Sequence, residues 1–178
     1  MSFAFSRRSF LKYTAVAAVA VAGASLFTGC KVDTSDSYNA LRTTPGELTV
    51  LQVTAAMGNY VEASKSYTPP DVTGTTIAFP FKITNGRANP IYVNPNNFKA
   101  TVLNDKDEFI TKYTASNGLT LDAPLCDTNL KKGASVSGNI NLKLGAALEP
   151  GQSIVLTYCP DLQYNEYSLN WKTTRAKG

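Results

Sequence analysis

Residues able to carry out chemistry are few in this chain of 178 residues, which contains three cysteines and 13 acidic residues but no histidine. Without an imidazole, histidine-based triads, histidine acid–base catalysis and metal sites that need an imidazole ligand are all excluded. The cysteines are Cys30, Cys126 and Cys159. A cysteine nucleophile needs a base nearby, and its usual base is histidine. The sequence therefore predicts a protein without catalytic residues, cofactor or metal site.

Three neighbouring carboxylates are the one candidate for a cation site. Asp105, Asp107 and Glu108 follow an apparent strand, and three carboxylates in four residues could ligate Ca²⁺. The glycine and the distant glutamate of an EF-hand loop are missing. Asn104 begins a run of residues typical of a turn between two strands, so a turn is the preferred interpretation.

Carboxylates that meet in space could also hydrolyse a glycosidic bond, and this is the basis of a hydrolase alternative. No motif favours any pair among the scattered candidates, which are Glu62, Asp71, Glu149 and Glu166.

Aromatic residues near the C-terminus could stack on a sugar or contact another protein. Tyr167, Leu169 and Trp171 alternate with polar residues, so they share one strand face and Trp171 is expected in the core. Tyr164 lies in a polar loop and is the freer candidate for a contact.

The N-terminal residues have the three parts of an export signal. Arg7 and Arg8 precede an apolar stretch of about 15 residues, too short for the roughly 20 that span a bilayer as a helix. The sequence from Ser6 to Lys12 resembles twin-arginine signals at every fixed position, including Arg7, Arg8, Phe10 and Leu11. The resemblance implies export by that route, while a general secretory signal would change the route but not the destination.

The end of the apolar stretch is similar to the lipobox of bacterial lipoproteins. In that motif small residues precede a cysteine, here Cys30, and Phe27 stands where leucine is usual. The resemblance implies cleavage before Cys30 and a diacylglycerol on its thiol. Each buried methylene contributes roughly 0.8 kcal/mol, so the acyl chains would hold the protein at the outer face of the cytoplasmic membrane, in the bacterial cell envelope.

If Cys30 carries the lipid, Cys126 and Cys159 remain in a compartment where disulfides persist. We therefore predict a disulfide between them, with free buried thiols as the alternative. In the chain-entropy model, closing this loop would stabilise the fold by roughly 3 to 4 kcal/mol.

The net charge of +4 arises mainly in the signal, because Arg7, Arg8 and Lys12 lie there without acidic residues. About +1 is left in the exported part. The composition thus lacks the basic excess that binds nucleic acid by phosphate neutralisation, or that attaches a polybasic segment to anionic lipid. Nucleic acid is excluded as the partner.

Three parts are expected along the chain. Residues 1–29 form the signal peptide, and residues 30–46 form the lipidated cysteine and a polar, flexible tether. Residues 47–178 form one domain, since about 149 exported residues are one domain's worth.

Apolar and polar residues alternate in this domain, which is the period of a strand with one buried face. Pro80 interrupts the clearest alternation and cannot donate a ladder hydrogen bond, so that strand is expected at a sheet edge or with a bulge. Gly138 fills a gap on another apolar face, at a bulge or close contact. The predicted strands are 48–56, 76–84, 97–103, 108–113, 135–144, 152–158 and 167–173. About seven short strands without a helical period predict an all-β fold, an antiparallel β-sandwich.

The domain resembles a family of uncharacterised immunoglobulin-like domains of secreted bacterial lipoproteins, related in fold to mycobacterial secreted antigens. The segments that carry the resemblance are Phe81–Asn85, Tyr92–Phe98 with Asp105–Asp107 at a following turn, and Leu130–Gly138. Lys132 stands where proline is frequent in the family. The family has no established activity, so the resemblance implies a fold rather than a function.

The sequence as a whole predicts a lipid-anchored, non-catalytic binding or accessory module outside the cytoplasmic membrane. Its ligand would be a protein, a peptide or an envelope glycan. The alternative is a structural subunit of an envelope or transporter complex, and an unrecognised hydrolase is the third possibility.

Overall fold

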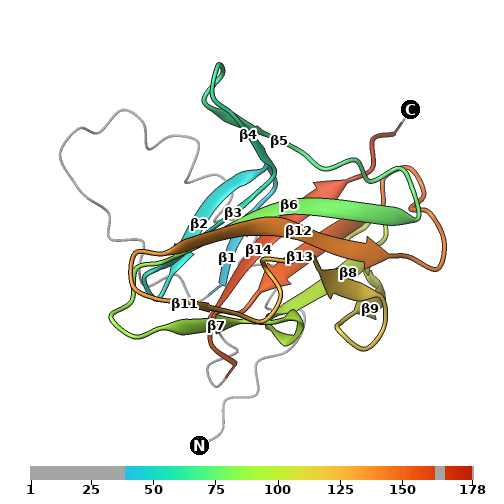
Figure 1. Ribbon diagram of the computed structural model, residues 1–178. Coiled ribbons are helices and arrows are strands. Elements are labelled where there is room, and N and C mark those ends of the chain that lie inside the picture. The colour runs from blue at the N-terminus through green and yellow to red at the C-terminus, as the bar shows by residue number, and fades with distance from the viewer. Residues whose placement is uncertain (1–38, 163–166, 178) are drawn as a thin grey trace, which may run out of the picture. The chain divides into compact units, whose positions relative to one another are not determined.

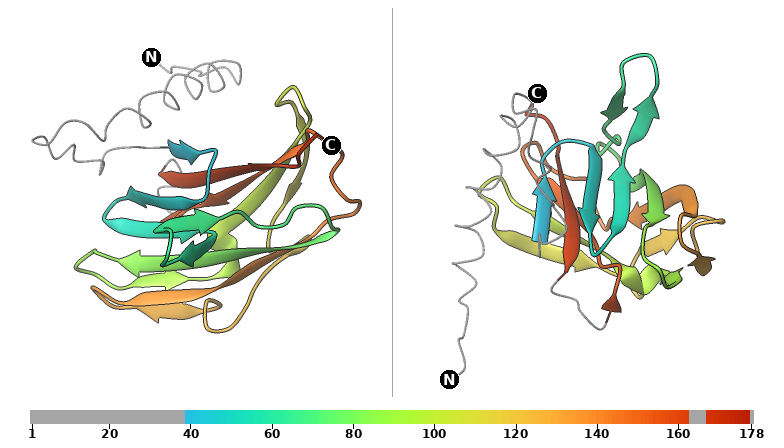
Figure 2. Two further views of the ribbon diagram at one scale, coloured as in Figure 1. Left: turned by 90° about the horizontal axis from the view of Figure 1, so that it is seen from above. Right: turned by 90° about the vertical axis from the view of Figure 1, so that its left-hand side faces the viewer.

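Two five-stranded sheets pack face to face as the layers of a β-sandwich (Figures 1 and 2), which confirms the predicted all-β class. The structure is a computed structural model that describes residues 39–162 and 167–177. The predicted signal residues Arg7, Arg8, Phe10 and Leu11 and the predicted lipidation site Cys30 lie outside the described residues. None of the described segments is a helix long and apolar enough to cross a membrane.

The first sheet has the strand order β1-β14-β13-β8-β9. Its strands are β1 (Asn39–Arg42), β14 (Ser168–Thr174), β13 (Ser153–Tyr158), β8 (Phe98–Leu103) and β9 (Phe109–Tyr113). β1 runs parallel to β14, with Asn39 opposite Ser168, and the other neighbours are antiparallel.

The position of β1 corrects the expected tether, because the chain joins the sandwich at residue 39 rather than after residue 46. Polar contacts hold this strand. Ser168 Oγ donates to Asn39 Oδ1 at 2.6 Å, and Asn170 Nδ2 donates to the Ala40 carbonyl at 3.1 Å. A strand that is held by polar contacts does not need alternating apolar residues. The sequence of β1 therefore resembles that of a linker.

The second sheet has the strand order β10-β12-β6-β3-β2. Its strands are β10 (Leu119–Leu121), β12 (Ser135–Lys143), β6 (Thr76–Asn85), β3 (Val53–Met57) and β2 (Gly46–Val50). The single strand expected over 48–56 is a hairpin of β2 and β3. Leu51 and Gln52 form its turn with φ angles of 48° and 60°, a left-handed conformation that neither residue type signals in a sequence.

Pro80 lies in the interior strand β6, not at a sheet edge, and the register of β6 with β12 runs through it without a bulge. The expectation for Pro80 is therefore wrong. β3 pairs with β6 only as far as Met57 opposite Phe81, so the side of Pro80 that lacks an N–H has no ladder partner to lose. The Pro80 carbonyl instead accepts a 2.8 Å hydrogen bond from the Gly58 N–H.

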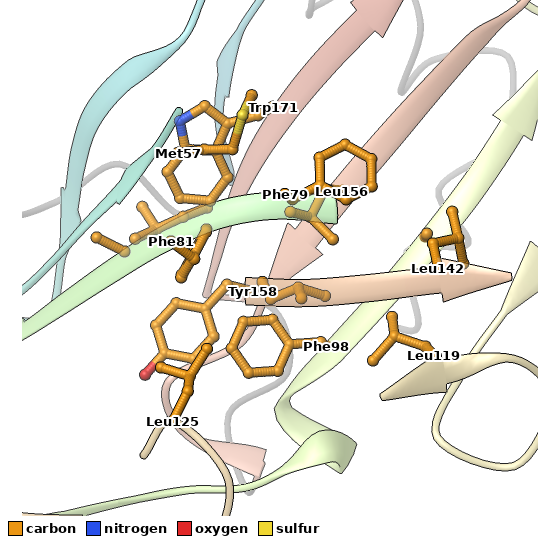
Figure 3. Packing of buried hydrophobic residues seen from close by; sticks show 14 of the residues in the cluster. Met57, Phe79, Phe81, Phe98, Leu119, Leu125, Leu142, Leu156, Tyr158 and Trp171 are labelled. Carbon is orange, nitrogen blue, oxygen red and sulfur yellow. The ribbon is translucent and has the colours of Figure 1, made fainter. Parts of the chain in front are cut away.

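The core lies between the sheets, and Phe81 is at the centre of its aromatic cluster (Figure 3). The Phe81 ring makes edge contacts with Phe98, Tyr158 and Trp171 at centroid distances of 5.5, 5.8 and 5.1 Å. Trp171 is fully buried, as its alternation predicted, and its Nε1–H donates to the Gly46 carbonyl at 2.9 Å.

Gly138, expected at a bulge or a close contact, and Asn85 lie at the margins of this core. A Cβ added to Gly138 would lie 3.0 Å from Leu125 Cβ, so this glycine permits a close contact with the loop after β10. The Asn85 side chain, fully buried, closes the end of β6. Its Nδ2 donates to the Leu130 and Asn89 carbonyls at 2.9 Å, and its Oδ1 accepts from the Arg87 N–H at 2.8 Å.

Two small sheets complete the fold, each of two antiparallel strands. They are β7 (Ile91–Val93) with β11 (Thr128–Leu130), and β4 (Asn59–Val61) with β5 (Ser66–Thr68). A 3₁₀ turn, η3 (Pro95–Asn97), connects β7 to β8. Each of these strands has three residues, which is too short for an alternating pattern to identify it in the sequence. They are therefore additional to the seven strands that the sequence predicts.

Candidate functional site

The β4–β5 hairpin projects from the body of the sandwich, and it is the most prominent departure from the two layers (Figures 1 and 2). It leaves the end of β3 at Gly58, whose φ of 104° is in the left-handed region. A Cβ at this position would lie 2.6 Å from the Thr68 carbonyl oxygen, so only glycine permits the turn-out. The local sequence thus directs the hairpin away from the sheet.

Two tyrosines face each other across the hairpin. Tyr60 is opposite Tyr67 in the register, and their ring centroids are 5.1 Å apart with the planes tilted by 58°. The Tyr60 side chain is 50% exposed. Rigid aromatic side chains with a polar tip are enriched where proteins contact partners, because they bury much area and retain a hydrogen-bonding group.

Tyr67 fixes the hairpin to the second sheet. Its hydroxyl donates a 2.7 Å hydrogen bond to Oε1 of Glu47 in β2. Partial burial, followed by this hydrogen bond and the charge of Glu47, raises the pKa of Tyr67 to about 12, so the phenol keeps its proton at neutral pH.

A hollow of about 570 Å³ lies between the hairpin and the outer face of the second sheet. Register places Glu47, Ala56, Lys82 and Ser137 side by side across β2, β3, β6 and β12. The hollow is lined by Glu47, Gly58, Asn59, Tyr60, Tyr67, Pro80, Phe81, Lys82 and Ser137. It therefore combines two tyrosine rings with one negative and one positive side chain.

This arrangement suits binding rather than hydrolysis. Glu47 is the one carboxylate among the described residues that line the hollow, whereas glycoside hydrolysis requires two. The candidate carboxylates Glu62, Asp71 and Glu149 lie in separate loops. Asp71 accepts hydrogen bonds from Thr73, and Glu149 accepts one from Gln152. Glu166 lies outside the described residues.

The three carboxylates of the predicted acidic turn each contact a polar or basic side chain of the protein itself. Asp107 contacts Lys172 Nζ at 2.5 Å, and Asp105 lies 3.8 Å from Lys177 Nζ. Glu108 accepts a 2.8 Å hydrogen bond from Asn104 Nδ2. In the described part of the chain, no three histidine, cysteine, aspartate or glutamate side chains are grouped so that they could hold a metal ion. A turn is the interpretation that these contacts favour.

The structure corrects the predicted disulfide, because Cys126 and Cys159 are both free. Different elements fix the two residues. Cys126 ends a turn in which its N–H donates to the Asp122 carbonyl, and its thiol donates to Asp127 Oδ2 at 3.4 Å. Cys159 follows β13, where its N–H donates to the Asn97 carbonyl at 2.8 Å. Burial raises the pKa of both thiols, which disfavours the reactive thiolate.

The aromatic residues near the C-terminus do not form the site. Tyr158 and Trp171 are buried in the core, Tyr167 packs against it, and Tyr164 lies outside the described residues. The tyrosines beside the hollow, Tyr60 and Tyr67, were not among the residues predicted from the sequence. A signal was available, because two three-residue runs, each with a central tyrosine, flank the mainly polar residues 62–65 in the manner of a short hairpin.

Comparison with known proteins gives weak similarities to solved structures. No protein-family model and no curated protein sequence matches the chain. The ycdA protein of Bacillus subtilis, provisionally described as a lipoprotein, aligns at 12% identity and a TM-score of 0.43 over 72% of this chain and 38% of that one.

Two further structures show the same level of similarity. An uncharacterised β-sandwich protein of Clostridium difficile aligns at 8% identity and a TM-score of 0.43, over 75% of this chain and 93% of that one. The archaellum periplasmic stator complex of FlaF and FlaG from Sulfolobus acidocaldarius aligns at 13% identity and a TM-score of 0.36, over 64% of this chain and 96% of that one. Similarities this slight do not transfer a function, and the fold assignment rests on the strand pairing itself.

Proposed function

We propose that this protein is a non-catalytic binding or accessory module of the cell envelope. It is held at the outer face of the cytoplasmic membrane by lipid on Cys30, and it engages a protein, a peptide or an envelope glycan through the β4–β5 hairpin. The anchor rests on the lipobox and on the twin-arginine signal.

The observation that carries the binding role is the tyrosine pair beside the hollow. Tyr60 is half-exposed on a projecting hairpin, and Tyr67 is held in place by Glu47. Such a surface offers ring faces to an apolar segment or a sugar ring. Glu47 and Lys82 supply hydrogen-bonding charges of both signs. A partner therefore gains orientation as well as contact area.

Site-directed crosslinking in living cells tests this role. A photoreactive phenylalanine analogue replaces Tyr60 in the full chain, and a matched variant carries it at Tyr92, which is 54% exposed on β7. We expect a recurrent adduct from position 60 that is weak or missing at position 92. Mass spectrometry of the adduct distinguishes a protein or peptide from a glycan. Equal adduct patterns at both positions, or none at position 60, would contradict a hairpin site.

The anchor has a separate test. Cys30→Ser should abolish incorporation of labelled fatty acid and release the protein from membranes, because the thiol that accepts diacylglycerol is gone. Cys126→Ser is the matched control and should leave both properties unchanged. Fatty acid still attached to the Cys30→Ser protein would exclude the lipobox assignment.

A further inference from the structure

The point at which the chain enters the sandwich limits how far the domain can lie from its anchor. β1 begins at Asn39, and residues 31–38 separate it from Cys30. At 3.3–3.6 Å for each residue, even a fully extended segment of this length reaches only about 30 Å. A lipid on Cys30 therefore keeps the first residue of β1 within about 30 Å of the membrane surface.

One end of the first sheet lies beside that entry point. Asn39 is opposite Ser168 at the start of β14, and the next residue, Leu169, is opposite Tyr158 at the end of β13. Tyr158 is in turn opposite Phe98, the first residue of β8. The same end of the sheet thus carries Cys159, which follows β13, and η3, which precedes β8.

A second hollow, of about 250 Å³, lies at this end. Two lysines on neighbouring strands line it. Lys112 in β9 is opposite Thr101 in β8, and Lys99 is two residues before Thr101, so it lies on the same face of β8. The lining residues are Asn96, Asn97, Phe98, Lys99, Lys112, Thr114, Ala115, Ser116 and Cys159. Among the described residues, no carboxylate lines the hollow and neither lysine has an ion pair.

The two hydroxyls of the lining are already hydrogen-bonded within the protein. Ser116 Oγ lies 2.9 Å from Thr114 Oγ1, and Thr114 Oγ1 donates to Asn117 Oδ1 at 2.9 Å, so the two lysines are the groups that can bind an anion. Burial raises the pKa of the Cys159 thiol and the positive charge of Lys99 opposes that shift, which agrees with both residues lining the same hollow. Two cations with no described carboxylate beside them match the chemistry of a phosphate group.

We propose that this hollow binds the phosphate of an anionic lipid headgroup in the membrane to which Cys30 attaches the chain. The inference rests on the lipid anchor of the proposed function. The volume is below the roughly 300–1,000 Å³ of sites for drug-sized ligands, which suits a headgroup rather than acyl chains.

Two lysines are enough under these conditions. Each lysine near an anionic surface is attracted to it, and a short tether makes the encounter intramolecular at a high effective concentration. The contact orients the domain rather than attaching it. Figure 1 places the β4–β5 hairpin on the opposite side of the molecule from β7, which leads into η3. A membrane at η3 would leave the hairpin directed away from the bilayer, free to meet a partner.

The composition alone indicates no attraction to anionic lipid, because the charges nearly cancel over the exported chain. Strand pairing brings Lys99 and Lys112 to one hollow, while Asp105 and Asp107 lie in the β8–β9 turn at the other end of these strands. The net charge of the chain does not reveal that the lysines and the aspartates lie at opposite ends of these strands.

Lysine footprinting on vesicles tests the proposal. The full-length lipidated protein is reconstituted into phosphatidylcholine vesicles with and without phosphatidylglycerol, and acetylation of each lysine is followed by mass spectrometry. We expect Lys99 and Lys112 to react at least about threefold more slowly when phosphatidylglycerol is present. Lys106, in the turn at the far end of the sheet, should react equally in both. Equal rates at Lys99 and Lys112, or equal protection of Lys106, would overturn the proposal.

Three further measurements distinguish a headgroup site from a soluble-phosphate site and from a failure of the lipid anchor. Lys99→Gln should remove the protection of Lys112, whereas Lys106→Gln should leave it intact. Inorganic phosphate added to phosphatidylcholine vesicles should give no comparable protection, and equal protection would assign the hollow to soluble phosphate instead. Flotation of the same samples reports the anchor. Protein that floats without lysine protection refutes the headgroup site alone, and protein that fails to float refutes the anchor and this inference with it.

Discussion

The Tyr67 hydroxyl donates a 2.7 Å hydrogen bond to Glu47 Oε1, and so connects the projecting hairpin to the edge strand β2 across 20 positions of sequence. Tyr67 is also the cross-strand partner of Tyr60, the exposed ring of the candidate site. One hydrogen bond thus links the orientation of the site to the body of the sandwich. This relationship makes Glu47 and Tyr67 positioning residues and leaves Tyr60 as the contact.

Tyr67→Phe should loosen the hairpin without unfolding the domain. Both partners are at the surface and water can replace the lost bond, so the free energy of unfolding should fall by less than about 1 kcal/mol. Amide exchange in residues 59–68 should accelerate. Chemical denaturation and hydrogen exchange measure the two effects, and Tyr92→Phe is the matched control. A hairpin that exchanges as slowly in Tyr67→Phe as in the unchanged protein would refute the positioning role.

The hydrogen bond between Tyr67 and Glu47 should be lost at high pH, when the Tyr67 phenol ionises. The pKa of Tyr67 is raised in the folded protein from its ordinary value of 10.0 to about 12. A raised pKa means that the protonated form is favoured by folding, so the contribution is complete below pH 10 and is lost as the pH rises through 12. Ultraviolet titration should show one fewer phenol ionising near pH 12 in Tyr67→Phe. Loss of a phenol that ionises near pH 10 instead would contradict the assignment.

Phe81→Ala should destabilise the whole domain, because Phe81 contacts three other aromatic rings in the core and is 3% exposed. Truncation of a buried phenylalanine costs about 3–5 kcal/mol through lost transfer energy and the cavity that remains. Urea denaturation gives the change in unfolding free energy. Phe81→Leu should retain much of the stability. A cost for Phe81→Ala no larger than that of Phe81→Leu would show that the aromatic cluster contributes little.

Asn85→Ala should cost about 1–3 kcal/mol for each buried group that it leaves unpaired. The side chain satisfies the Leu130 carbonyl from inside the protein, and water cannot reach that group readily. Asn129, exposed on β11, provides the control, since Asn129→Ala should change the unfolding free energy by less than about 0.5 kcal/mol. Indistinguishable unfolding curves for the two variants would mean that the Asn85 contacts do not stabilise the fold.

The two described cysteines should behave as separate thiols. Both pKa values are raised by burial, so alkylation at each site should be slow at neutral pH and accelerate as the pH rises past 9. Cys126 should react before Cys159, because Cys159 is only 7% exposed. Peptide mapping after alkylation of non-reduced protein identifies the labelled site. A mass corresponding to a linked Cys126–Cys159 peptide, or an unfolding midpoint lowered by reductant, would restore the disulfide.

Local alternation was sufficient to predict the long strands. The apolar positions of β6 and β12 face the core as predicted, and Trp171 lies inside for the same reason. Burial of one face is a property of each segment alone, so the amino-acid pattern carries it. The short strands β1, β4 and β5 depend on hydrogen bonds to distant residues, and a pattern of three or four residues does not specify them.

The sequence by itself determined that the chain forms a β-sandwich without histidine chemistry, and it supplies the export and lipidation motifs on which the proposed location rests. Only the tertiary structure decided which residues meet. Tyr67 and Glu47 come together through a hairpin that turns out at Gly58, and Lys99 and Lys112 through the pairing of β8 with β9. It likewise left Cys126 and Cys159 as free thiols on different elements. Contacts of this kind depend on strand register and loop path, which the whole fold fixes and no local period encodes.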